Sequence, residues 1–143
     1  MAVIFFNEGV QKPKLTFTVL KKWIISEIEL KGFKPGNINY IFCSDEYLLE
    51  MNKKHLNHDY YTDIITFNYC ENDLISGDMY ISTDRIKENS ILLGTQQSEY
   101  YRVIIHGVLH LLGYNDDTLD ESKEMRKQED DALMRLKKYI NIN

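Results

Sequence analysis

The chain has 143 residues, 43% of them hydrophobic, and a formal net charge of -5. This length and composition suffice for one self-sufficient core, so we expect a single domain over residues 1–143, with no linker, repeat or low-complexity tract. The net negative charge argues against indiscriminate binding of nucleic acid, and we expect no role for DNA. The N-terminus shows no signal-peptide pattern, and no segment approaches the roughly 18 apolar residues of a membrane span, so we expect a cytoplasmic protein.

The charge is unevenly distributed along the chain. Residues 1–35 hold six lysines against three acidic residues, a local balance of +3. These lysines are Lys12, Lys14, Lys21, Lys22, Lys31 and Lys34. The set is consistent either with an ordinary solvated surface or with a surface that follows RNA phosphates. The two cysteines, Cys43 and Cys70, form no Cys-x-x-Cys pair, so we expect buried free thiols rather than zinc ligands.

The first half of the chain alternates strand and helix patterns. Apolar and aromatic residues over 2–6 predict a strand. From 16 to 30, apolar side chains recur every three or four residues, which predicts an amphipathic helix that ends at Gly32. Alternation over 36–43 predicts a second strand, after which a capped helix reaches about Leu56.

The second half begins with two β-branched and aromatic segments, 62–69 and 77–82, that we expect to pair antiparallel across a polar loop. Three helices follow, over about 83–93, 96–112 and 118–139. The middle one is largely apolar, which indicates a central position. Together these elements predict an α+β fold, with one mixed sheet of about four strands packed by four or five helices.

The central helix carries the pattern that points to chemistry. His106 and His110 are four residues apart, so their imidazoles lie on one helix face and can converge on one ion. Gly113 can adopt the left-handed conformation that ends a helix, and the returning chain brings Asp116 towards the same ion. Singly, each residue fits a core histidine or a helix stop. Jointly, two imidazoles and one carboxylate predict a catalytic Zn²⁺ site at the end of this helix, with other divalent metals as alternatives.

The spacing of these residues has the frame of the metzincin signature H-E-x-x-H-x-x-G-x-x-H, but with two departures. Gly107 stands where a peptidase has its glutamate base, and Asp116 stands where the third histidine would be. Glycine cannot take a proton from zinc-bound water or pass one to a leaving amine. A metallopeptidase therefore has the histidine frame in its favour and Gly107 against it.

The segment His-Gly-Val-Leu-His-Leu-Leu-Gly-Tyr at 106–114 resembles the signature of the YbeY family of endoribonucleases, which act in rRNA maturation. Upstream, Met51-Asn52 and the run Thr-Asp-Ile-Ile-Thr-Phe at 62–67 resemble the family's "LN…TDVLSF" segment, and 77–81 resembles its "GDI.I" strand. The likeness covers roughly residues 45–135 in consistent order. It implies an α+β fold, a zinc-like ion and an RNA substrate.

The sequence departs from this family pattern at the candidate site. The family's third histidine is Asp116 here, which is chemically sound because carboxylate oxygen is a normal zinc ligand. A functional arginine that the resemblance implies before the TDVLSF strand falls on Leu56. His58, or Lys54, could replace it as a cation or proton donor, although the sequence favours a simple polar loop residue at His58 over a functional one.

With the metal motif, the resemblance implies a metal-dependent, single-strand-type endoribonuclease that acts in rRNA maturation and ribosome quality control. Its metal ligands are His106, His110 and Asp116, and His58 is a catalytic candidate. The expected partners are an rRNA precursor and the ribosomal small subunit. No general base is assigned, although Asp63 and Asp78 are acids in the matched strands. A ribosome-assembly factor with a structural metal is the alternative, and a metallopeptidase is a weaker one.

Overall fold

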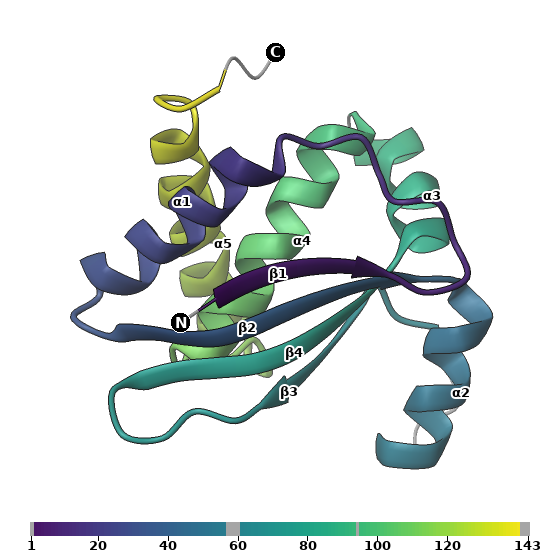
Figure 1. The fold of residues 1–143 in the computed structure, drawn as a ribbon, viewed down its shortest axis with the longest axis horizontal. Helices are drawn as coiled ribbons and strands as arrows, with labels where there is room; N and C mark the ends of the chain where they lie inside the picture. The colour runs from purple at the N-terminus through teal and green to yellow at the C-terminus, as the bar shows by residue number, and fades with distance from the viewer. Residues whose placement is uncertain (1, 57–60, 94, 141–143) are drawn as a thin grey trace.

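The structure is a computed structural model, which describes residues 2–56, 61–93 and 95–140. In the described part of the chain, four strands and five helices follow one another in the order β1, α1, β2, α2, β3, β4, α3, α4, α5 (Figure 1). Their bounds are β1 Ala2–Asn7, α1 Phe17–Leu30, β2 Lys34–Cys43, α2 Asp45–Leu56, β3 Ile64–Asn68, β4 Leu74–Ser82, α3 Thr83–Leu93, α4 Gln96–Leu111 and α5 Leu119–Leu136.

The strands form one mixed sheet in the order β1-β2-β4-β3. β1 and β2 run parallel, as do β2 and β4, whereas β3 and β4 are antiparallel. This arrangement confirms the predicted mixed sheet and the predicted antiparallel pair. Alternation explains the core face of β2, since Ile38, Tyr40 and Phe42 lie in the main core while Asn39 and Ile41 between them are less buried.

The two faces of the sheet are covered differently. α1, α4 and α5 lie on one face, and α4 packs between its helical neighbours and the strands (Figure 1). Ten residues of α4 are buried, which confirms its central position. α2 lies on the other face, where Leu48 packs with Ile65 and Tyr80 in a smaller cluster. The end of α4 is therefore the point at which helices, β3 and the chain after the helix come together.

Two sequence expectations need correction. β4 starts at Leu74 rather than at Gly77, because Leu74 and Ile75 already pair with the beginning of β2. Of the two cysteines, Cys43 is buried as expected but Cys70 is only partly buried. No helix in the described ranges is both long and apolar enough to cross a membrane. That residues 1–143 act as a single domain stays a prediction.

Candidate metal centre

The end of α4 determines where the three predicted ligands lie. Thr95 caps the start of the helix, its side chain accepting a hydrogen bond from the backbone of Ser98. After Leu111 the chain turns back at Gly113, whose φ of 101° lies in the left-handed region that favours glycine. The amide of Gly113 donates to the carbonyl of His110, which helps to satisfy the end of the helix. The chain then runs back along the helix, which brings Asp116 next to the two histidines, as the spacing predicted.

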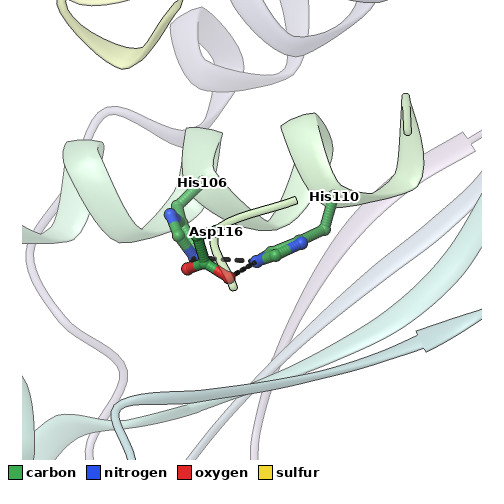
Figure 2. A group of neighbouring side chains, drawn as sticks. All are labelled: His106, His110 and Asp116. Atoms are coloured by element: carbon green, nitrogen blue, oxygen red, sulfur yellow. Dashed lines mark hydrogen bonds and ion pairs between the residues drawn. The ribbon is translucent and has the colours of Figure 1, made fainter. Parts of the chain in front are cut away.

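Three side-chain atoms converge on one point beside α4 (Figure 2). The Nε2 atoms of His106 and His110 are 3.0 Å apart. Carboxylate oxygens of Asp116 lie 3.5 Å from His106 Nε2 and 3.7 Å from His110 Nε2. Zinc bonds of about 2.0–2.1 Å in a tetrahedron place ligand atoms roughly 3.3 Å from one another, close to the 3.5 Å between Oδ2 of Asp116 and His106, whereas the other oxygen, Oδ1, makes the approach to His110. The donor set and its spacing fit one zinc-sized ion.

These three side chains open into a cleft of about 520 Å³ between α4 and β3. The wall facing the histidines comes from α2, from β3 and from the residues just before β3, and it carries polar groups such as Asn52, Thr62 and Asn68. Among its described lining residues none is a lysine or arginine. Leu56 also lines the cleft, so the position at which the family resemblance implies an arginine faces the candidate centre with an apolar side chain.

His106 is held from behind by a buried carboxylate. Its Nδ1 lies 2.7 Å from Oε2 of Glu129 on α5, and the other carboxylate oxygen of Glu129 accepts a 2.8 Å hydrogen bond from Arg102. Burial lowers the pKa of His106, but the hydrogen bond and charge of Glu129 outweigh it and raise the pKa above its ordinary value. Burial likewise raises the pKa of Glu129, yet the hydrogen bonds from His106 and Arg102 bring it below its ordinary value.

His110 experiences a different environment. Burial and the neighbouring His106 lower its pKa, against the attraction of Asp116 and a backbone hydrogen bond with Tyr114. Its imidazole is therefore neutral near neutral pH, as a metal ligand must be. Asp63 lines the same cleft, and burial raises its pKa above the ordinary value despite the nearby His106.

Gly107 faces the sheet rather than the cleft. A Cβ atom at this position would lie 2.3 Å from Sδ of Met79 and 3.0 Å from Cδ1 of Ile64. A glutamate at this position could not be accommodated without moving the buried strand side chain beneath it. Helix packing against Met79 thus favours glycine here.

Of the other residues singled out from the sequence, those that the structure describes do not join the cluster. His58 lies outside the described residues. Lys54 is exposed on α2. Asp78 accepts a hydrogen bond from Asn39 on the neighbouring strand β2. Among the N-terminal lysines, Lys31 bonds Gln128 on α5 and lies over the ring of Tyr114, next to the turn that carries Asp116.

The sequence argument missed two residues behind the cluster: Glu129, which bonds His106, and Arg102, which bonds Glu129. A signal for Glu129 existed, because it lies four residues after buried Met125 and three before buried Ala132, on the apolar face of α5. An acid at such a position needs a buried partner. Arg102 precedes His106 by one helical turn, which places it on the same side of α4.

Comparisons with known proteins bear on the same residues. The sequence profile of the family described as "Endoribonuclease YbeY" matches residues 8–137. A protein of that name from Bacteroides thetaiotaomicron is 47% identical over 134 residues, covering 93% of this chain and 98% of the relative. One from Porphyromonas gingivalis is 43% identical over 137 residues, covering 95% and 91%. In shape, the chain is similar to the solution structure of a Thermotoga maritima protein, with a TM-score of 0.69 at 24% identity over 96% of this chain and 91% of that one. The chain belongs to the YbeY family.

Proposed function

We propose that this protein is a metal-dependent endoribonuclease that cuts single-stranded RNA, with one zinc ion held by His106, His110 and Asp116. The observation that carries the proposal is the convergence of two imidazole nitrogens and a carboxylate in an open cleft. Family membership supports it, because the relatives in the comparison are named endoribonucleases. Residues 1–143 would act as one catalytic domain.

In this proposal the ion would supply the reactive chemistry, and the side chains of the cleft would surround the RNA. A zinc ion in this position supplies a Lewis acid for a phosphoryl oxygen and lowers the pKa of a water to about 7. The described lining carries neutral polar side chains such as Asn52 and Thr62 and no basic one. Asp63 lies beside His106 in the same cleft and is the acid best placed to hold a proton during the reaction. His58 stays a candidate for this role.

The resemblance supports a more specific assignment. As substrate we propose a precursor of ribosomal RNA, with the ribosomal small subunit as partner, in the cytoplasm and in the service of rRNA maturation and ribosome quality control. Sequence selectivity would come from RNA shape or from the ribosome, because the described lining of the cleft offers few base-reading groups.

The decisive experiment is cleavage of a labelled single-stranded RNA by purified protein, before and after chelation and zinc replacement. We expect chelation to abolish cleavage and zinc to restore it. His110→Ala and Asp116→Ala should each lower zinc occupancy and cut the rate by about 100-fold or more, because two protein ligands hold zinc poorly.

Asp120→Ala is the matched control, since it removes an exposed carboxylate from the first turn of α5 and should leave zinc and rate unchanged. Cleavage that survives complete chelation would contradict the proposal. A zinc-loaded protein that binds RNA and never cuts it would favour the assembly factor instead.

A further inference from the structure

The carboxylate behind His106 occupies a defined and buried position. The side chain of Glu129 is 6% exposed and lies 23 residues beyond His106, on α5. Its Oε2 atom meets His106 Nδ1 at 2.7 Å, while His106 Nε2 points the opposite way, towards His110 and Asp116. One imidazole thus joins the candidate centre to the interface between α4 and α5.

The geometry determines which nitrogen of His106 carries a proton. Arg102 remains protonated in proteins and donates to Oε1 of Glu129, which holds that carboxylate in its ionised form. An ionised carboxylate can only accept hydrogen bonds, so Nδ1 of His106 must donate. In the neutral imidazole the remaining Nε2 then has a free lone pair, directed at the point where the ligands converge.

Both oxygens of Glu129 are engaged, and this fixes the plane of the carboxylate. Oε1 takes the 2.8 Å bond from Arg102, whose second terminal nitrogen lies 3.0 Å from Asp130. Oε2 is left for His106. Arg102 therefore orients Glu129, and Glu129 orients the imidazole.

Among the residues that the structure describes, no side chain of another helix bonds the second histidine, His110, in this way. The contacts of His110 come from its own helix and from the turn that follows it, namely His106 and Asp116. Local chain geometry therefore orients His110, whereas His106 depends on a side chain from another helix. A substitution at Glu129 should consequently affect one ligand and leave the other in place.

We infer that Glu129 is a positioning residue of the metal centre, which holds His106 as an Nε2 ligand and strengthens its donation to the ion, with Arg102 holding Glu129. The inference rests on the proposed metal site. Carboxylate partners of this kind are typically worth 10–100-fold in metal affinity.

The test measures zinc affinity by competition with a chromogenic chelator. We expect Glu129→Met, which keeps the length of the side chain but cannot accept the bond, to weaken zinc binding about 10–100-fold. Glu129→Gln, which keeps an acceptor oxygen without the charge, should lose less. The visible spectrum of the cobalt-substituted protein should change in Glu129→Met, because the His106 ligand is altered.

Glu27→Met is the matched control. It removes an equally buried carboxylate, bonded to Arg135 on α5 and away from the cleft. This variant should lose stability while its zinc affinity and cobalt spectrum stay as in wild type. An equal loss of zinc affinity in both variants would reduce Glu129 to a structural role and overturn the inference.

A measurement on the unaltered protein avoids any dependence on variant folding. Long-range ¹H–¹⁵N spectra of the zinc-free chain at pH 8 should show His106 protonated at Nδ1 and bare at Nε2. A proton at Nε2 would overturn the inference, as would wild-type zinc affinity in Glu129→Met. If the wild-type protein itself bound no divalent metal, the proposed function would fail and the inference with it.

Discussion

Helix α5 takes part in two buried glutamate–arginine pairs that look alike and differ in one respect. The side chain of Glu27 on α1 is 3% exposed, and both of its carboxylate oxygens accept hydrogen bonds from Arg135, at 2.8 and 2.7 Å. Glu129 is 6% exposed and gives one oxygen to Arg102 and the other to His106. The first pair is closed on itself and joins two helices. The second has an acceptor left over, and that acceptor faces the candidate centre.

The difference shows how a buried ion pair that holds two helices together can also orient a candidate metal ligand. Burying a carboxylate is costly unless its charge and lone pairs are matched, and both pairs meet that requirement. Splitting the two oxygens between partners ties the packing of α4 and α5 to the orientation of a ligand. We therefore expect the Glu27 pair to affect stability alone, and the Glu129 pair to affect stability and metal binding together.

The largest effect should come from breaking the closed pair. Arg135→Met leaves the Glu27 carboxylate buried without a counter-charge, and removing one partner of such a pair costs about 3 kcal/mol of unfolding free energy. Urea denaturation of the zinc-free protein measures this loss. Zinc affinity of the folded variant should equal that of wild type. A loss below about 1 kcal/mol would show that Glu27 reaches water without its partner.

The sequence predicted the three candidate ligands but not Glu129 and Arg102, which hold one of them, and the reason is physical. His106, His110 and Asp116 fall within eleven residues, so helix periodicity and one glycine turn determine their approach. Glu129 and Arg102 meet through the packing of α5 on α4, and which residues face each other there depends on the crossing of the two helices. No local pattern carries that information.

The fold shows the same division between local and long-range information. The helices and strands follow from periodicity, and the β3–β4 pair from its short loop. The early start of β4 at Leu74 was missed, because it depends on pairing with Lys34 of β2, forty residues away. The reason for Gly107 also required the structure, since only the packing against Met79 shows what a side chain there would displace.

A smaller effect, in its dependence on pH, should separate the two pairs. Since Glu129 raises the pKa of His106, the charged form of this pair stabilises the zinc-free fold below the ordinary histidine pKa of about 6.5. That contribution is lost as the pH rises through the raised pKa of His106. Glu129→Gln should therefore cost about 1 kcal/mol more at pH 5.5 than at pH 8, the size of a charge-assisted over a neutral hydrogen bond.

The pair of Glu27 and Arg135 provides the contrast, because Arg135 keeps its charge at both pH values. The loss of unfolding free energy in Glu27→Gln should therefore be the same at pH 5.5 and pH 8. His110, whose pKa is lowered, destabilises the protein as it is protonated, but it does so in wild type and variant alike. Denaturant titrations of wild type and of each variant at the two pH values measure the four losses of unfolding free energy, one for each variant at each pH. Equal pH dependence in the two variants would contradict the assignment of the second oxygen to His106.

The smallest effect should come from a third pair on the same helix, Lys127 and Asp131, one turn apart at 3.4 Å and largely exposed. Water screens these charges, and ordering two long side chains offsets most of their attraction, so Lys127→Gln should cost at most about 0.5 kcal/mol. The loss should shrink further in 0.5 M salt, as determined by denaturant titration, because screening acts most on exposed charges. All three pairs involve α5, so the series compares burial and partner geometry on one helix. If Lys127→Gln cost as much as Arg135→Met, burial would not set the order, and the contrast between the closed and the divided carboxylate would lose its physical basis.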